Sequence, residues 1–355
     1  MNDTTSGCES GKVGRRMDGV QLNSPVQTQG IKEKRGISGS TVKIVAIVSM
    51  LIDHFGAAVI SRQLMAEGLG EIMGSGEMYA IMDWLTEHAT LYYSYSAIRM
   101  IGRIGFPIFC FLLVEGYRNT RNVKRYAMRL ALFALISEVP FDLAFTGKYF
   151  ELGYQNVYFT LFLGLFTLCV YDFFARYRQV VPESPIWMLP TVLGVLFPAS
   201  YGANCLSTTI TLNAEGLTLV FVILCLIVVG GLVLYGRKRG MKRVQIVCAD
   251  MTVLTMVMYL ADFMKTDYAG LGVLTITMMY IFRKSKVKSM AAGCAALTVM
   301  SISEATAFLS LIPISLYNGK RGLKMKYFFY AFYPVHLLLL YLLAIAMGLG
   351  SEVIF

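Results

Sequence analysis

Several ionisable side chains lie inside segments that are otherwise apolar. The segment SMLIDHFGAAV carries Asp53 and His54, IGRIGFPIF carries Arg103, LISEVPFDLAF carries Glu138 and Asp142, and FYPVHLLLLY carries His336. Ionisable groups in a membrane span are costly, and they usually face the interior of a helix bundle and mark a working site. Two of these six are imidazoles, so the sequence predicts proton chemistry or transport inside a membrane protein.

The composition is that of a polytopic membrane protein. The chain has 355 residues, of which 56% are hydrophobic and 15% are charged, and its mean hydropathy is +0.59. Runs of about 20 apolar residues, enough for a helix to cross the hydrocarbon core, recur between Thr41 and Met347. We therefore predict an all-α fold with about 10–11 transmembrane helices in one bundle, because irregular backbone is not tolerated in lipid.

The charge and the cysteines exclude other classes. The net charge of +10 comes from Lys and Arg clustered in short connections between spans, as cytoplasmic loops require, so we predict no nucleic-acid partner. We expect the bacterial cytoplasmic membrane as location, with the N-terminus inside. The seven cysteines show no CxxC and no metal-type spacing, so we expect neither a disulfide framework nor a metal site.

The apolar runs divide the chain. Residues 1–42 are polar and lack an apolar run, so we predict a disordered cytoplasmic tail and no cleavable signal, followed by a transmembrane domain at 43–349. Residues 62–97 are expected to form an external loop. Residues 289–317 are long for one helix and short for two, so two short crossings or a re-entrant hairpin both remain open. The other expected spans are 41–61, 98–116, 126–145, 153–175, 186–203, 215–235, 244–263, a span ending near 282, and 327–347.

Depth along these helices brings the polar residues together. At 1.5 Å per residue, His54 and Glu138 lie roughly 20 Å from the inner surface, and Arg103 lies in the same layer. His336 follows Pro334, which frees a backbone carbonyl and kinks the helix. The sequence thus predicts a polar pocket in the outer half of the membrane. Asp142, Asn156, Asp262 and Asp267 fall slightly further out, at helix ends. The substrate-binding candidates are Asp142, Asn156, Asp267 and Tyr268.

Each candidate also has a structural explanation. His54 suits a general base with a tunable pKa, but a structural histidine remains an alternative. Asp53 points about 100° away from His54 on a helix, so we expect it to hold a neighbouring helix, such as that of Arg103. Arg103 could instead be structural and pair with Glu138 or Asp53. Asp142 and Asp267 could be helix caps, and Asn156 a helix-end hydrogen bonder.

Two basic connections form a second candidate site. EGYRNTRNVKRYAMR and YNGKRG combine Lys and Arg with amide and small residues, which suits phosphate recognition. The positive-inside rule explains most of this charge equally well. A nucleotide P-loop is not expected, because no Ser or Thr follows NGKRG. The cofactor-binding candidates are Arg118, Arg121, Lys124, Asn318, Lys320 and Arg321.

Longer motifs resemble the TraX family of bacterial membrane proteins. They are LIDHFG, RIGFPIFCFLLVEGYRNTRNVKRYAMRLALFALISEVPFDLAF, DYAGLGVL, YNGKRG and FYAFYPVHLLLLYLL. The best-known member of that family is implicated in N-terminal acetylation of a conjugative pilin. The family is also similar to membrane acyltransferases that use acetyl-CoA and a membrane-embedded histidine.

The resemblance implies roles for the candidates. Acetyl-CoA, or another acyl-CoA, is the expected co-substrate, with its phosphates at the basic connections. His54 takes a proton from the acceptor, Arg103 and Asn156 stabilise the oxyanion, and Asp53, Glu138 and His336 hold the arrangement. The expected partners are membrane lipid, acyl-CoA and an acceptor that is a protein N-terminus, a sugar or a small amine; a homo-oligomer stays open.

Two other functions stay open. One is a proton-coupled transporter or flippase that uses His54, Glu138 and His336 as a proton relay. The other is a non-catalytic accessory membrane protein of conjugation or pilus assembly. No internal repeat is visible in the sequence, so an inverted-repeat transporter gains no support.

Overall fold

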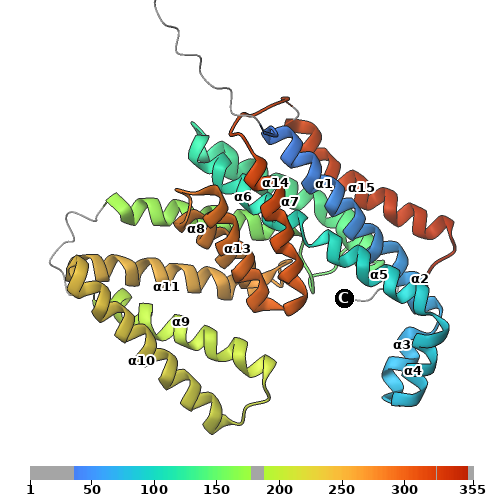
Figure 1. Cartoon of the computed structure of the whole chain (residues 1–355), viewed down its shortest axis with the longest axis horizontal. Coiled ribbons are helices and arrows are strands. Elements are labelled where there is room, and N and C mark those ends of the chain that lie inside the picture. The colour runs from blue at the N-terminus through green and yellow to red at the C-terminus, as the bar shows by residue number, and fades with distance from the viewer. Residues whose placement is uncertain (1–35, 177–187, 325, 351–355) are drawn as a thin grey trace, which may run out of the picture. The chain divides into compact units, whose positions relative to one another are not determined.

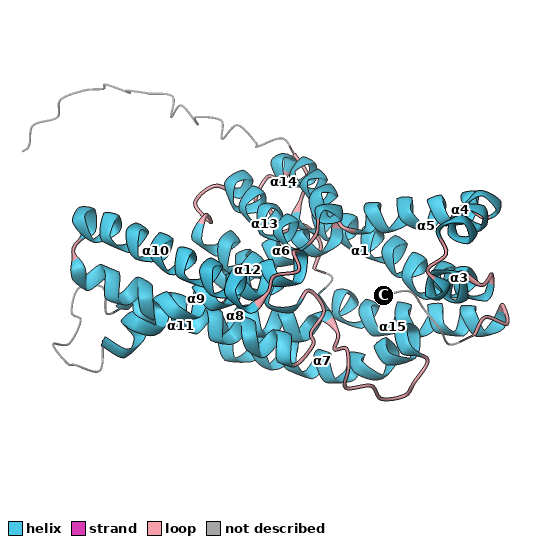
Figure 2. Cartoon of the chain, turned by 90° about the horizontal axis from the view of Figure 1, so that it is seen from below, coloured by secondary structure: helices cyan, strands magenta, loops and turns pink. Residues whose placement is uncertain are grey.

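The predicted all-α class is confirmed by the computed structural model, which describes residues 36–176, 188–324 and 326–350. Across these residues every named element is a helix, as Figure 1 and Figure 2 show. Two parts of the sequence predictions lie outside the described residues: the tail from 1 to 35 and the start of the span expected at Ile186. Helix α1 already begins at Gly39, so the last residues assigned to the tail are helical.

Seven of the described segments are long and apolar enough to cross a membrane. The first joins α1 (Gly39–Phe55), the π-helical turn η1 (Gly56–Ile60) and α2 (Ser61–Ala66), and the second joins α5 (Ala89–Gly102) to α6 (Gly105–Asn119). The others are α8 (Val157–Arg176), α9 (Met188–Thr209), α10 (Ala214–Arg239), α11 (Met241–Phe263) and α15 (Lys326–Ala346).

The remaining helices are shorter or more polar. They are α7 (Val123–Thr146), α12 (Ala269–Ile281), α13 (Lys286–Met300), the 3₁₀ helix η3 (Ile302–Ser310) and α14 (Leu311–Leu316). A count of ten or eleven crossings requires these to span as well, and it stays a prediction. Helix α13 packs against η3 and α14, so the region left open between 289 and 317 is a helical hairpin.

The external loop expected at 62–97 is instead largely helical. Helices α3 (Leu69–Ser75) and α4 (Met78–Glu87) lie between α2 and α5. The turns before and after α3 are made by Gly68 (φ +84°) and Gly76 (φ +68°), because glycine adopts positive φ without steric cost. The loop was predicted from the acidic residues of this stretch, but the stretch also forms a small apolar core that includes Leu64, Leu69 and Trp84.

Helix α1 lies at the centre of the contacts that build the site. It packs against α5, α6 and α15, and α15 packs against α7. At its end, the π-helical turn η1 is braced by side chains: Ser61 Oγ donates to the Ala57 carbonyl (2.5 Å) and Arg62 Nη1 donates to the Ala58 carbonyl (2.8 Å). The buried Arg62 also donates to Leu143 O at 3.0 Å, which ties this turn to α7.

Candidate functional site

A cavity of about 990 Å³ lies beside the end of α1. Its walls come from α1, α5, α6, α7, η3, α15 and the connections that precede α8 and α12. Five of the predicted site residues line it: Asp53, His54, Arg103, Asp267 and Tyr268. The structure therefore brings these five predicted residues together at one cavity, and their roles in catalysis and binding stay predictions.

His54 forms a buried pair with His336 of α15. His54 Nδ1 lies 2.7 Å from His336 Nε2. The rings are nearly parallel (5°) with centroids 5.0 Å apart, so they meet edge to edge in about one plane rather than face to face. Phe145 and Tyr333 contact the His54 ring edge-on, at 5.4 and 5.8 Å between centroids, and hold its orientation.

The other nitrogen of His336 decides which nitrogen of the pair carries a proton. His336 Nδ1 lies 2.8 Å from the Phe332 carbonyl, which can only accept, so Nδ1 carries the proton. In the neutral ring His336 Nε2 is then an acceptor, and His54 Nδ1 must donate to it. This leaves the lone pair of a neutral His54 on Nε2, as a general base requires.

Asp53 holds the neighbouring helix, as predicted, but through a different arginine. Its Oδ2 accepts from Arg99 Nη1 at 2.7 Å, and α1 and α5 pack tightly at this point because residue 102 is glycine. A Cβ on Gly102 would lie 2.1 Å from Asp53 Oδ1. Arg99 and Arg103 are one helical turn apart, and only Arg99 faces α1.

Arg103 pairs with neither Glu138 nor Asp53, which corrects the sequence-based pairing. Its Nη1 lies 2.9 Å from Glu304 Oε1, and the Glu304 side chain is 3% exposed. Arg103 and Ile104 form the break between α5 and α6. Ser49 Oγ caps the end of α5 by donating to the Ile101 carbonyl at 2.8 Å.

Asp267 is held in the cavity by a strained connection. Lys265 (φ +52°), Tyr268 (φ +63°) and Ala269 (φ +45°) have left-handed backbones, which cost about 1–2 kcal/mol each in non-glycine residues. Asp267 Oδ1 accepts from Tyr154 Oη at 3.0 Å. Such outliers persist where the surroundings over-determine them, often at functional sites, and the side chain of Asp267 bonds to Tyr154 in the connection before α8.

Glu138, Asp142 and Asn156 do not line this cavity. The buried amide of Asn156 donates to Glu138 and to Ala134 O, and its Oδ1 caps α8 by accepting from the Tyr158 N–H at 3.0 Å. Asp142 accepts from the Glu151 N–H at 2.8 Å. Asn156 is thus a hydrogen bonder at the end of a helix. The contacts of all three residues join α7 to the start of α8.

A second polar cluster surrounds Glu115 near the other end of α1. Glu115 accepts from Tyr317 Oη at 2.8 Å, and the charges of Lys43, Arg118 and Lys286 act on it. Lys286 also donates to the carbonyl of Tyr317. Of the predicted phosphate-binding residues, Arg118 joins this cluster.

The YNGKRG connection clasps the start of α1. Asn318 is used within the clasp: its Nδ2 donates to Gly36 O (3.1 Å) and its Oδ1 accepts from the Lys320 N–H (2.8 Å). The N–H groups of Gly39 and Ser40 donate to the carbonyls of Lys320 and Arg321. The backbone of Lys320 and Arg321 therefore lies beside the start of α1. Among the described residues, the side chains of Arg121 and Lys124 make no hydrogen bond or ion pair.

Comparison with known proteins identifies the family. The TraX protein family matches residues 38–212 and 211–344. The chain belongs to the TraX family. The probable fimbrial assembly protein FimC, serogroup H1, of Dichelobacter nodosus is 29% identical over 140 residues, which are 38% of this chain and 46% of that relative. The match thus spans about half of the relative's length. No solved structure matches.

The structure adds residues to the TraX motifs that sequence reasoning missed. Arg99 lies one turn before the Arg103 of RIGFPIF, and its spacing of four residues was the available signal. Glu304 lies in the segment whose topology was left open. The sequence carries no separate signal for Lys43, Glu115 and Lys286, because they lie in predicted spans or in the basic connections.

Proposed function

We propose that this TraX-family chain is an acyltransferase of the bacterial cytoplasmic membrane. It moves an acetyl or other acyl group from acyl-CoA to an amine or hydroxyl of an acceptor. The observation that carries the proposal is His54 on the cavity wall, whose hydrogen bond to His336 behind it leaves the lone pair of His54 on Nε2. The family resemblance supports the same reading.

The residues at and behind the cavity wall have proposed roles in acyl transfer. His54 Nε2 takes the proton of the acceptor N–H or O–H as the acceptor attacks the thioester carbonyl. His54 then returns that proton to the sulfur of the departing CoA. His336 holds His54 in the required tautomer and stabilises its charged form. Arg99 and Arg103 supply guanidinium donors on the cavity wall, and fixed donors aimed at developing charge are effective in a site that excludes water.

The basic cluster around Glu115 would hold the phosphates of CoA. Lys43, Arg118 and Lys286 converge there, and Lys320 and Arg321 extend the charge along the clasp on α1. Charge-assisted hydrogen bonds from Lys and Arg are the usual means of holding phosphate. Because these residues are basic, we place this face in the cytoplasm and the N-terminus inside.

The relative described as a probable fimbrial assembly protein suggests the kind of acceptor. We propose that the acceptor is a protein of pilus or fimbrial assembly, with a sugar or small amine as alternatives. An accessory, non-catalytic role in the same assembly would need no base on a cavity wall.

A transporter is the second candidate, and one observation favours it. The span Ala89–Asn119 is interrupted between α5 and α6 at Arg103. Broken helices with their ends at a polar cavity are a hallmark of transporter binding sites. A proton relay through His54, Glu138 and His336 is not favoured, because Glu138 is bonded to Asn156 away from the cavity.

The test uses purified protein in detergent with acetyl-CoA. We expect CoA binding in wild type and in His54→Ala, with slow release of free CoA in wild type alone. His88→Ala is the matched control, because His88 lies outside the cavity and stacks on Trp84; it should release CoA at the wild-type rate. Release by His54→Ala at the wild-type rate would remove His54 from the mechanism, and absence of CoA binding by the wild type would refute the transferase.

A further inference from the structure

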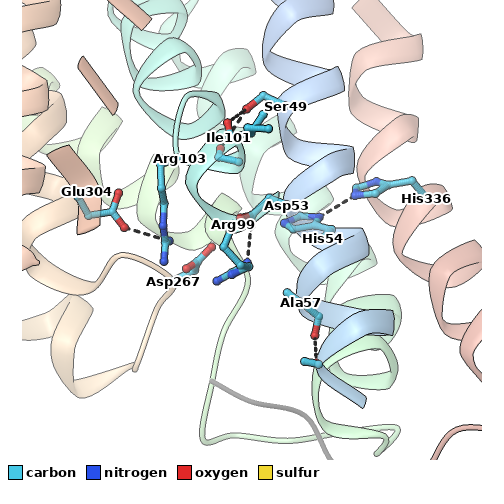
Figure 3. A network of polar contacts seen from close by, with 12 residues as sticks. Ser49, Asp53, His54, Ala57, Arg99, Ile101, Arg103, Asp267, Glu304 and His336 are labelled. Atoms are coloured by element: carbon cyan, nitrogen blue, oxygen red, sulfur yellow. Dashed lines mark hydrogen bonds and ion pairs between the residues drawn. The ribbon is translucent and has the colours of Figure 1, made fainter. Parts of the chain in front are cut away.

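Five charged side chains on the cavity wall alternate in sign. Figure 3 shows Asp53 beside Arg99, Asp267 between Arg99 and Arg103, and Glu304 on the far side of Arg103. Asp53 is bonded to Arg99 (2.7 Å) and Glu304 to Arg103 (2.9 Å). All five line the same cavity. Three carboxylates against two guanidinium groups leave the set one positive charge short.

The hydrogen bonds show the same shortage of donors. Asp53 Oδ1 and Glu304 Oε2 are buried and lack a hydrogen-bond partner among the described residues. Asp267 accepts from the neutral Tyr154 hydroxyl and forms no ion pair among these residues. A buried carboxylate oxygen without a donor is costly, so a ligand that brings both a positive charge and N–H donors would complete the set.

We infer that Asp53, Arg99, Asp267, Arg103 and Glu304 form a binding site for one organic cationic group, an ammonium or a guanidinium, which exchanges with a proton on Asp267. A metal ion is not the expected occupant, since no group of three or more His, Cys, Asp or Glu among the described residues is arranged to hold one. The site does not depend on acyl transfer, because it follows from charge and donor count alone.

The setting of Asp267 supports proton exchange. Burial raises the pKa of Asp267 to about 6, while the hydrogen bond from Tyr154 and the charges of Arg103 and Arg99 act to lower it and the charge of Asp53 to raise it. Asp267 belongs to the connection between α11 and α12, outside the spans. The titratable and charged groups that face it from the surrounding elements are Asp53 on α1, Arg99 and Arg103 on α5, Tyr154 before α8, Glu304 on η3, Tyr333 on α15, and Tyr268 beside it.

The test measures binding of butylammonium to the purified full chain in detergent by titration calorimetry from pH 5 to 8. Guanidinium, sodium ion and neutral butanol are the comparison probes. We expect both organic cations to bind, with affinity about constant above pH 7 and about tenfold weaker at pH 5, because a proton then competes at Asp267. Butanol and sodium ion should bind at least tenfold more weakly.

Two nearly isosteric variants and one control complete the design. Asp267→Asn should lower the affinity at pH 7.5 at least tenfold and remove the pH dependence, and Glu304→Gln should lower the affinity similarly while keeping the pH dependence. Glu151→Gln removes the same charge at the cavity rim, where Glu151 pairs with Lys148 at 2.5 Å, and should change the affinity less than twofold. Equal binding of butanol and butylammonium, a pH-independent wild type, or equal effects of Glu151→Gln and Asp267→Asn would overturn the inference. The wild-type pH series decides even if a variant fails to fold.

Discussion

A single methyl group at position 102 should break the contact that joins α1 to α5 beside His54. In Gly102→Ala the new Cβ would lie 2.1 Å from Asp53 Oδ1, 2.2 Å from its Cβ and 2.5 Å from its Cγ. These distances are far below contact distance, and rotation of the Asp53 side chain relieves only two of the three. Helix α1 must therefore move, and the Asp53–Arg99 bond of 2.7 Å is lost with it.

The expected cost is about 3 kcal/mol. Overpacking of this kind costs about 1–3 kcal/mol, and separating a partly buried ion pair adds to it. At roughly 2 °C per kcal/mol for a chain of this size, the thermal midpoint should fall by about 6 °C. The assay is thermal unfolding in detergent followed by circular dichroism. Gly230→Ala on α10 is the matched control, because nothing lies within 4 Å of its added Cβ, and it should leave the midpoint unchanged or raise it.

Substitutions at position 53 test whether the added methyl group clashes with Asp53. Because the clash includes the Asp53 Cβ, Gly102→Ala should remain costly in an Asp53→Ala background and become nearly neutral in an Asp53→Gly background. If Gly102→Ala lowers the thermal midpoint equally in the Asp53→Ala and Asp53→Gly backgrounds, the added methyl group clashes with a group other than Asp53. A midpoint within 1 °C of wild type for Gly102→Ala alone would refute the close approach of α1 and α5.

Three further predictions concern separate parts of the site. Asn156→Ala should lower the free energy of unfolding by about 3 kcal/mol, because it removes the cap of α8 and the hydrogen-bond donor to Glu138. The control Asn213→Ala removes the exposed cap of α10 and should cost about 1 kcal/mol. Equal costs for the two variants, measured by thermal unfolding, would contradict the buried contact. The pKa of Asp267 is raised to about 6 in the folded state, so the folded protein binds a proton more tightly than the unfolded chain does. The free energy of unfolding should therefore fall by on the order of 2–3 kcal/mol as the pH rises from 4 to 6, and then level off. This fall should shrink in Asp267→Asn, and it would be absent if the carboxyl were solvated. Lys286→Gln should weaken CoA binding about tenfold in low salt, whereas Lys242→Gln should not, and equal effects would place the phosphates elsewhere.

Sequence reasoning found the right helices at the cavity more readily than the right partners. It placed Asp53 against the helix of Arg103, which is correct, but the bonded residue is Arg99. Hydropathy and spacing define which helix enters the bundle, whereas the rotation of α5 relative to α1 decides which of two arginines one turn apart meets the carboxylate. That rotation depends on Gly102, whose missing side chain allows α1 to approach.

Residues outside continuous helices were harder to place from the sequence. Glu304 lies on a 3₁₀ helix, whose periodicity differs from the α-helical one used to find spans. Glu138 is predicted at the depth of His54, and in the structure it faces α8, where Asn156 supplies its hydrogen-bond donor. Depth in a membrane can be counted along a helix, but the direction in which a side chain points also needs the neighbour that satisfies it.

Helix α1 joins the two polar regions and limits what can connect them. It runs without interruption from Gly39 to Phe55, so Lys43 in the basic cluster and His54 at the cavity lie eleven residues, or about 16 Å, apart along one rod. A phosphate group held by Lys43, Arg118 and Lys286 therefore cannot itself reach His54. If the proposed transfer takes place, the group delivered to His54 must be carried at the end of an extended arm whose charged end stays at the basic cluster. An acyl-CoA has that form, whereas a small acyl phosphate does not, and it is this separation, rather than either cluster alone, that argues for the acyl-CoA donor.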